Sequence, residues 1–474
     1  MPEIFDLVVF GGGTVGMAIA LDASLRGLKV AVIERKCLGK QTNYSSLGLI
    51  QRDPKYLYTD VDLVWMNAMD CGLMKNIASD FLKRQSLVIP VFPESKYPLW
   101  FLDSFIESLD SFRDLSCSER HRLLSPRELA EEEINILKNT IGAVKYFEMV
   151  IDPVLWVRAI EKVIKKNGAE VFEFQEIFGF NEHIYDGKRV LNSVLIIDTI
   201  SGWKTWINGL YFINATGPWA PMFPRKFNAK TFKSRLTKGT SIVIKQKLSK
   251  NGIILFNRKG KYITVLPKDT GTVIGPTNYD ISDTVSENPD LLKPEKFEIE
   301  ELLDVVNDFF KSKVKQEDIV EIKCGLRPQL NHQGVKPDNI THEFAIIDHD
   351  ARDNIENFCS VFGGKLSNQL RMAKESVDFA VSSMSKKWRG KKIKDWHIPN
   401  IKISGSGDLL FDSCGQDCAV SYSYVEKQAL DYSYADKHCV GRMAAMKRIK
   451  SLLFIVPFII RGFLKEIRRR FSRG

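Results

Sequence analysis

The sequence predicts an α/β protein that contains a parallel sheet and, further along the chain, an antiparallel sheet. The first observation is an apolar run at 6–10, which ends in three glycines and is followed by a helix pattern at 14–27 and a second apolar run at 29–34. A strand, a helix and a strand in that order indicate a βαβ unit, and hence a parallel sheet. The second observation is the alternation of apolar and polar residues within 170–210 and 241–275, which is typical of antiparallel strands.

The remaining elements follow from local start and stop signals. Gly27 is placed to end the first helix, and Pro294 suits the first turn of an amphipathic helix. Gly363, Gly364 and Lys365 predict a turn. We expect helices at 154–166, 295–313 and 366–388, and strands at 169–174, 210–214 and 358–362.

The net charge of +10 is concentrated at the C-terminus of the 474-residue chain. Residues 442–474 hold ten of the 68 Lys and Arg residues and one of the 58 Asp and Glu residues, so this segment carries +9. The preceding residues carry 58 basic and 57 acidic side chains, or +1. A nearly neutral body does not indicate a nucleic-acid-binding protein, and no nucleic acid is expected as a partner.

The basic tail 442–474 also contains an apolar run at 452–460. This run is shorter than the roughly 20 residues that a membrane-spanning helix needs. Pro457 interrupts it and Arg461 ends it. We interpret the tail as a basic amphipathic segment that lies at a membrane surface. The alternative is a buried C-terminal helix with a solvated basic end.

Eight cysteines are scattered along the chain, and the N-terminus lacks the basic start and apolar core of a secretory signal. We therefore expect a cytoplasmic protein whose thiols are reduced. A metal cluster of Cys414, Cys418 and Cys439 is an alternative that the spacing does not favour, because it lacks a second close pair. No metal site is expected.

The glycines of the first turn have the spacing Gly11-x-Gly13-x-x-Gly16, which is typical of dinucleotide-binding turns. Glycines let the backbone approach a pyrophosphate, and the helix N-terminus supplies N–H groups and positive potential. Glu34 closes the second strand 18 residues after Gly16, where an acid holds a ribose hydroxyl. The strand, the helix and the acid together favour dinucleotide binding over a generic tight turn. They do not separate FAD from NAD.

Further motifs follow this unit along the chain: TNYSSLGLI at 42–50, IDP at 151–153, NATGPW at 214–219, KGT at 238–240, CGLRP at 324–328 and SVFGGKL at 360–366. In this order they resemble the FAD-dependent glycerol-3-phosphate dehydrogenases, within the wider D-amino-acid-oxidase-like flavoprotein superfamily. The resemblance covers about residues 1–385. The NATGPW and VFGGKL stretches are its most specific parts, since many flavoproteins share the glycine motif.

The resemblance implies a Rossmann-like FAD-binding domain assembled from separated segments, an antiparallel-sheet α+β substrate domain and a C-terminal helical extension. The FAD-binding domain would comprise 1–90, 145–225 and 325–388, and the substrate domain 91–144 and 226–324. The extension would cover 389–441 and precede the basic amphipathic tail.

The resemblance also implies which positions contact FAD. A helix beginning at Leu366 would point its positive end at the flavin N1/O2 region, which becomes anionic on reduction. The expected cofactor residues are Gly11, Gly13, Thr14, Gly16, Glu34 and Arg35 for the ADP half, Thr42, Ser45 and Ser46 for the pyrophosphate and flavin, Val171 for the adenine side, Ala215, Thr216 and Gly217 for the ADP–ribityl portion, and Gly363, Gly364, Lys365, Leu366 and Ser367 for the flavin ring.

Arg327 matches the arginine that holds the substrate anion in this family, and a guanidinium is a natural bidentate partner for phosphate or carboxylate. Lys365 would pair with the substrate anion or with flavin O2, and Tyr56 also matches a substrate-site residue. The chain departs from the family just before Tyr56. Where the family reads His-Gly-Gly-x-Arg-Tyr-Leu, residues 51–57 read Gln-Arg-Asp-Pro-Lys-Tyr-Leu.

Lys55 thus stands in place of the family arginine. Ser241 stands in place of the histidine that follows Lys-Gly-Ser/Thr, and His342 in place of a second phosphate-binding arginine. Lys55 and His342 keep a capacity for positive charge, so a small anionic substrate still fits. His342 is also a candidate proton acceptor, because imidazole titrates near working pH, although a structural histidine is the alternative.

The resemblance implies an FAD-dependent oxidoreductase that moves a hydride from a small anionic alcohol to flavin N5, with electrons passed to quinone or another acceptor. The altered segment 51–55 leaves other substrates open, namely an amino acid, a hydroxy acid or another phosphorylated polyol. A non-catalytic FAD-binding protein is a further alternative. The basic tail and a quinone acceptor would place the protein peripherally on the inner, cytoplasmic face of a membrane.

Overall fold

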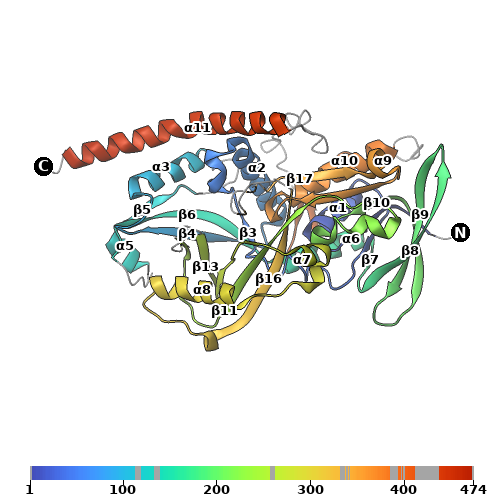
Figure 1. The fold of residues 1–474 in the computed structure, drawn as a ribbon, viewed down its shortest axis with the longest axis horizontal. Helices are drawn as coiled ribbons and strands as arrows, with labels where there is room; N and C mark the ends of the chain where they lie inside the picture. The colour runs from blue at the N-terminus through green and yellow to red at the C-terminus, as the bar shows by residue number, and fades with distance from the viewer. Residues whose placement is uncertain are drawn as a thin grey trace.

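The computed structural model is elongated, and each half of its length contains one large β-sheet (Figure 1). Helices pack on both sheets. The structure describes residues 3–112, 119–132, 139–256, 262–330, 337, 340, 342–384, 393–396, 398, 401–411 and 437–471. The predicted α/β fold class is confirmed.

The first sheet contains the predicted βαβ unit. β1 (Ile4–Phe10) pairs in parallel with β2 (Val30–Ile33) on one side and with β10 (Lys204–Asn214) on the other. The strand order is β17-β18-β10-β1-β2-β7, so the carboxyl ends of β18, β10, β1 and β2 meet at one edge of the sheet. The other strands of this path are β7 (Glu170–Phe172), β17 (Phe344–Asp348) and β18 (Phe358–Gly363).

Helices α1 (Thr14–Leu25), α6 (Pro153–Lys166) and α10 (Gln369–Met384) share one hydrophobic core with this sheet. Met17 of α1 and Trp156 of α6 are fully buried in it. A fully buried side chain of this size contributes roughly 1.5–3 kcal/mol to stability. Because α1 is buried along nearly its whole length, its sequence is apolar on every side rather than on one stripe.

The second sheet is antiparallel except where β4 pairs with β12. Its order is β15-β11-β14-β13-β12-β4-β6-β3, with β16 beside β11 and β5 beside β6. The antiparallel strands predicted within 241–275 are confirmed as part of it. The strands are β3 (Leu49–Ile50), β4 (Leu82–Val91), β5 (Arg122–Leu124), β6 (Gly142–Ile151), β11 (Arg235–Ile244), β12 (Gly252–Phe256), β13 (Tyr262–Lys268), β14 (Gly271–Gly275), β15 (Tyr279–Asp280) and β16 (Ile319–Gln329). The helices outside the core of the first sheet include α5 (Pro126–Glu131), α7 (Asp283–Glu287) and α8 (Lys296–Phe309). The short helix α9 (His349–Asp353) packs on β18 of the first sheet through the buried ring of His349.

Strands β4 and β6 cross the expected domain division. The expected FAD-binding segments 1–90 and 145–225 contain nearly all of β4 and most of β6, yet these two strands pair with each other and β4 pairs with β12. A division drawn by sheet would assign both strands to the second domain. The division itself stays a prediction.

The alternating stretch within 170–210 belongs to the first sheet. β8 (Gln175–Tyr185) and β9 (Lys188–Asp198) form an antiparallel hairpin, and β9 pairs with the first half of β10. The hairpin projects from the body at the right of Figure 1.

The helix expected at 366–388 begins later than predicted. Leu366–Asn368 form a 3₁₀ turn, and the α-helix α10 starts at Gln369. Asn368 Oδ1 accepts a hydrogen bond from Lys365 N at 2.9 Å, which closes this turn around its own side chain. The expected end at 388 lies outside the described residues.

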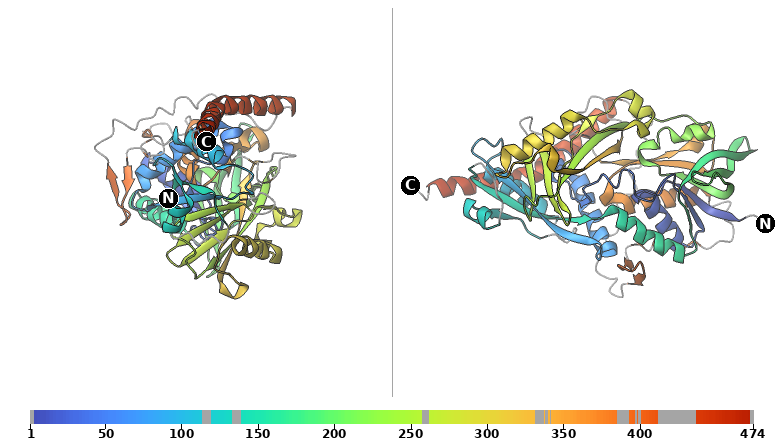
Figure 2. Two further views of the ribbon diagram at one scale, coloured as in Figure 1. Left: turned by 90° about the vertical axis from the view of Figure 1, so that its left-hand side faces the viewer. Right: turned by 90° about the horizontal axis from the view of Figure 1, so that it is seen from below.

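The C-terminal helix α11 (Lys437–Phe471) lies along the outside of the molecule, over α2 (Val61–Ala78) and α3 (Leu99–Asp110) (Figures 1 and 2). Ile455 is fully buried against this layer, and Pro457 lies inside the helix. Among the described helices, none combines the length and the apolar character that crossing a membrane requires.

The described cysteines Cys37, Cys71, Cys324 and Cys359 are free. Cys414 and Cys418, and the side chain of Cys439, lie outside what the structure describes. In the described part of the chain, no group of three or more His, Cys, Asp and Glu side chains could hold a metal ion.

Candidate active site

A cavity of about 420 Å³ lies at the carboxyl ends of β1, β2, β10 and β18. Open parallel sheets bind ligands at this edge, and the volume is within the range of about 300–1,000 Å³ for small-molecule sites. Most of the expected cofactor residues line it. These are Gly11, Gly13, Thr14, Glu34, Arg35, Thr42, Ala215, Thr216, Gly217, Gly363, Gly364, Lys365 and Leu366.

Two of these glycines bring backbone segments together around the cavity. A Cβ on Gly11, where φ is +104°, would lie 2.6 Å from the carbonyl oxygen of Ala215. A Cβ on Gly363, where φ is +92°, would lie 2.5 Å from the carbonyl oxygen of Glu343. Both positions therefore require glycine for their backbone conformation and for space.

The N-terminus of α1 and the carboxylate of Glu34 meet at the glycine turn. α1 starts at Thr14 with Gly13 as its N-cap and no capping side-chain bond, so its positive end is directed at the cavity. Glu34 Oε2 accepts a hydrogen bond from Gly12 N at 2.7 Å. Asn43 Oδ1 accepts one from Thr14 N at 3.2 Å, which fixes the 42–50 stretch against the turn.

A contact between distant segments lines the Arg35 end of the cavity. Arg35 donates two hydrogen bonds to Asp290, with Nη1–Oδ2 at 2.7 Å and Nη2–Oδ1 at 2.8 Å. Its guanidinium lies over the ring of Trp219, 5.2 Å from the centroid. Burial raises the pKa of Asp290, but Arg35 outweighs it and the pKa is lowered overall. The Asp290 carboxylate is therefore ionised at neutral pH.

Five expected cofactor residues do not line this cavity: Gly16, Ser45, Ser46, Val171 and Ser367. Gly16 lets α1 pack closely against the glycine turn, since a Cβ there would lie 1.9 Å from the Gly11 oxygen. The hydroxyls of Ser45, Ser46 and Ser367 are bonded to backbone atoms at 2.8, 3.1 and 3.1 Å. Val171 lies opposite a residue of β2 within the sheet.

A second cavity of about 80 Å³ brings together Lys55, Arg327 and His342, three of the expected substrate residues. Its lining also includes polar side chains from the second sheet and α8, among them Asn278 and Glu301. Tyr56 and Lys365 do not line it. Two basic side chains in a small cavity suit an anionic ligand.

Arg327 is held in place by strand β11 and by the segment between β14 and β15. Its Nη1 donates to Lys238 O at 3.2 Å and to Asn278 Oδ1 at 3.1 Å, and its Nη2 donates to Thr277 O at 3.0 Å. A Cβ on Gly239 would lie 2.1 Å from Nη2. The glycine of the KGT motif therefore makes room for the guanidinium.

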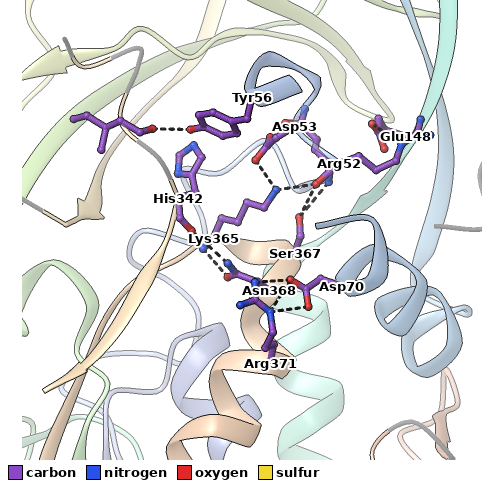
Figure 3. Close-up of polar contacts among 12 residues, drawn as sticks. Arg52, Asp53, Tyr56, Asp70, Glu148, His342, Lys365, Ser367, Asn368 and Arg371 are labelled. Carbon is purple, nitrogen blue, oxygen red and sulfur yellow. Dashed lines mark hydrogen bonds and ion pairs between the residues drawn. The ribbon is translucent and has the colours of Figure 1, made fainter. Parts of the chain in front are cut away.

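His342, which lines the second cavity, lies between Tyr56 and Lys365 (Figure 3). The Tyr56 hydroxyl donates to Ile340 O at 2.6 Å, and its ring meets His342 edge-on at 6.0 Å. Burial, reinforced by the positive charge of Lys55, lowers the pKa of His342 to about 3. Such a group is a weak base, so this environment does not favour the proton-acceptor role expected for His342.

The altered segment 51–55 builds buried ion pairs (Figure 3). Lys365 Nζ lies 2.5 Å from Asp53 Oδ2 and donates to Gln51 O at 2.8 Å. Arg52 is fully buried, with Nε 3.3 Å from Glu148 Oε1. The two positions at which the family has glycine thus carry one charged side chain each.

Sequence reasoning missed Asp53, Asn43 and Asp290. Asp53 had a signal, because it is a charged residue where the family pattern has glycine. Asn43 follows Thr42 directly, but no sequence motif indicates that its side chain accepts a hydrogen bond from the glycine turn. Asp290 is 255 residues from Arg35, and no motif connects them. Ser241, in place of a family histidine, is buried, and its hydroxyl makes no hydrogen bond to any described residue.

Comparison with known proteins assigns the chain to a family. Residues 6–364 match the family described as DAO, FAD dependent oxidoreductase. The chain belongs to this family. Its cofactor is FAD, and it is an oxidoreductase that resembles glycerol-3-phosphate dehydrogenase.

Similar curated proteins include the aerobic glycerol-3-phosphate dehydrogenase of Staphylococcus epidermidis, 26% identical over 85% of this chain and 72% of the relative, and that of Staphylococcus haemolyticus, 27% identical over 86% and 72%. Among solved structures, the FAD complex of glycerol-3-phosphate dehydrogenase from Bacillus halodurans aligns with a TM-score of 0.60 and 20% identity. The alignment covers 81% of this chain and 65% of that chain. The FAD-bound L-α-glycerophosphate oxidase of Mycoplasma pneumoniae aligns with a TM-score of 0.60 and 19% identity over 84% and 98%.

The large cavity fits FAD. The uncapped start of α1 and the close approach of Gly11 to Ala215 suit a pyrophosphate, and Glu34 lies beside this turn as a partner for ribose hydroxyls. Gly363, Gly364 and Lys365, which also line the large cavity, would hold the flavin ring. In this family FAD is the electron acceptor, and the protein binds it, orients it and adjusts its electrostatic environment.

Proposed function

We propose that this oxidoreductase oxidises a small anionic alcohol such as glycerol 3-phosphate. The observation that carries the proposal is the small cavity, which Arg327, Lys55 and His342 line together. Arg327 holds the anion, and the hydrogen bonds from Arg327 to the backbone and to Asn278 keep its guanidinium oriented before substrate arrives. FAD, which Gly363, Gly364 and Lys365 would help to hold, would supply the hydride acceptor for this oxidation, and quinone or another compound would be the second electron acceptor.

The altered segment favours a second candidate, a substrate other than glycerol 3-phosphate. The cavity carries Lys55 and His342 at positions where the family has two arginines, and it also contains the carboxylate of Glu301. An amino acid, a hydroxy acid or another phosphorylated polyol would satisfy such a mixed lining. A non-catalytic FAD-binding protein is the remaining alternative.

An anaerobic screen of flavin bleaching separates these readings. The purified, FAD-loaded protein is mixed without oxygen with glycerol 3-phosphate, with other phosphorylated polyols, with hydroxy acids and with amino acids, and the visible flavin absorbance is followed. Bleaching by glycerol 3-phosphate supports the proposal. Bleaching by another class alone moves the assignment to that class. Loss of absorbance with dithionite but with no substrate class indicates the non-catalytic alternative.

We infer that α11 attaches the protein peripherally to the inner face of an anionic membrane. One face of the helix packs on the body, where Ile455 is buried, while the outward face exposes apolar side chains. Basic residues accompany them, as expected for a helix that lies among anionic headgroups. The exposed apolar residues are Ile449, Leu452, Leu453, Val456, Ile460, Phe463 and Leu464, and the basic ones with described side chains are Lys450, Arg461, Lys465 and Arg468.

Vesicle sedimentation tests this attachment. Serine at Leu452, Leu453 and Val456 should reduce binding to vesicles that contain anionic lipid. Serine at Ile200 and Trp203, which are apolar residues near the β9–β10 turn and at least as exposed as those in α11, is the matched control and should leave binding at the wild-type level. Equal binding by the α11 variant and the wild type would show that another surface contacts the membrane.

A further inference from the structure

Asp53 occupies a backbone conformation that favours glycine. Its φ is +57°, in the left-handed region, and the glycerol-3-phosphate dehydrogenase pattern has the second glycine of His-Gly-Gly at this position. A non-glycine residue held there costs about 1 kcal/mol or more. The chain therefore carries a carboxylate where the backbone itself does not favour one, which points to a role for that side chain.

The carboxylate is buried and paired with one side chain. Asp53 Oδ2 lies 2.5 Å from Lys365 Nζ, and the two side chains are 7% and 14% exposed. Burial raises the pKa of Asp53, but the positive charge of Lys365, helped by Lys55, outweighs this and lowers the pKa overall. The Asp53 carboxylate is therefore ionised at neutral pH, and its ion pair with Lys365 carries no net charge.

This pair lies where charge acts on the flavin. Lys365 lines the cofactor cavity together with Gly363 and Gly364, and Asp53 lies behind it, away from the cavity lining (Figure 3). Two other buried acids in Figure 3, Glu148 and Asp70, are paired with Arg52 and Arg371. A lone lysine at this place would stabilise the anionic, reduced flavin, whereas a neutralised lysine does so much less.

We propose that Asp53 is a positioning residue that holds and neutralises Lys365, and that it thereby lowers the midpoint potential of the bound FAD. The inference rests on the flavin end of the cavity that the proposed function uses, but not on the identity of the substrate. A lower potential makes the reduced cofactor a stronger donor toward the second electron acceptor and makes substrate oxidation less favourable.

Dithionite titration of the FAD-loaded protein against a reference dye tests this without any substrate. D53N keeps the size of the side chain and an amide that tolerates the left-handed backbone, and D53G restores the family residue. Both should shift the midpoint potential to a more positive value by a similar amount. The double variant D53N/K365M should return close to the wild-type value, because both members of the pair are then uncharged.

Asp280→Asn is the matched control, since it removes one negative charge from an ion pair with Arg235 that lies outside the lining of the cofactor cavity, and it should leave the potential unchanged. The proposal is overturned if D53N and D53G keep the wild-type potential, or if the double variant keeps the potential of D53N. Flavin content of each variant, measured by absorbance, shows whether the cofactor is retained. If D53N loses FAD, the strain-free D53G decides the outcome alone. Failure of the substrate screen leaves this test unaffected, because dithionite supplies the electrons.

Discussion

The proposed cofactor cavity and the proposed substrate cavity are built from different parts of the chain. The proposed cofactor cavity is shaped by backbone, with Gly11 and Gly363 at positive φ in close contact with neighbouring segments. The proposed substrate cavity is shaped by the side chains of Lys55, Arg327 and His342. The first matches the family pattern at its glycines, and the second departs from it. A backbone cradle admits few substitutions, whereas side chains can be exchanged on the same fold. We therefore expect cofactor binding and substrate choice to be separable in this molecule.

The largest expected effect is on the backbone cradle. Gly11→Ala places a Cβ 2.6 Å from the Ala215 oxygen and forces a residue other than glycine to φ +104°. Strain of about 1–3 kcal/mol alone corresponds to a roughly fivefold to 150-fold weaker interaction, and the clash adds to it. We expect purified G11A to contain almost no FAD, as measured by the ratio of flavin to protein absorbance.

Gly27→Ala is the matched control. Gly27 also has a positive φ, +89°, but a Cβ there would have open space around it. G27A should bear the strain of the backbone and still retain FAD. If G11A and G27A retain FAD equally, the contact between the glycine turn and Ala215 does not shape the cofactor site.

The second effect concerns the side-chain cavity. Arg327→Ala removes the guanidinium and should raise the KM for the anionic substrate about 100-fold, because a charge-assisted contact is worth up to about 3 kcal/mol. FAD content should stay at the wild-type level. Arg235→Ala, on the adjacent strand β11 and paired with Asp280, is the control and should leave KM unchanged. A loss of FAD in R327A would mean that the two cavities are not separable.

The third effect is the pH dependence of stability that arises from His342 in the proposed substrate cavity. The pKa of His342 is about 3 in the folded protein against 6.5 ordinarily, so the unfolded chain binds the extra proton between these values. Stability is therefore fully present above about pH 6.5 and is lost as the pH falls. His342→Gln should remove up to about 2 kcal/mol of the stability loss between pH 7 and pH 5, as measured by urea unfolding. An identical loss in both proteins would show that His342 keeps its ordinary pKa.

The sequence predicted what depends on local pattern. The β1–α1–β2 unit, its glycines and the NATGPW and VFGGKL stretches located the cofactor cavity, because each works within a few residues. The contact of Arg35 with Asp290 joins segments from the two halves of the chain, and no periodicity reports such a pair. Segment 51–55 was visible as a departure, yet only the fold shows that Asp53 reaches Lys365 and that Arg52 reaches Glu148. Long-range side-chain pairing, not backbone pattern, is what the sequence alone does not supply.

The smallest effect is expected at Gly239, a glycine that leaves space for the side chain of Arg327 and does not line the cofactor cavity. Gly239→Ala brings a Cβ to within 2.1 Å of Arg327 Nη2, and the flexible end of the arginine can move away without unfolding the strand. The guanidinium then leaves its acceptors, and we expect the KM for the anionic substrate to rise roughly tenfold, equivalent to about 1.4 kcal/mol. Thermal stability and FAD content should change little. Gly179→Ala on β8, where the nearest atom to a new Cβ is an ordinary contact at 3.9 Å, is the control for adding a methyl group to a strand. An unchanged KM in G239A would show that Arg327 reaches the anion without the orientation that Gly239 permits.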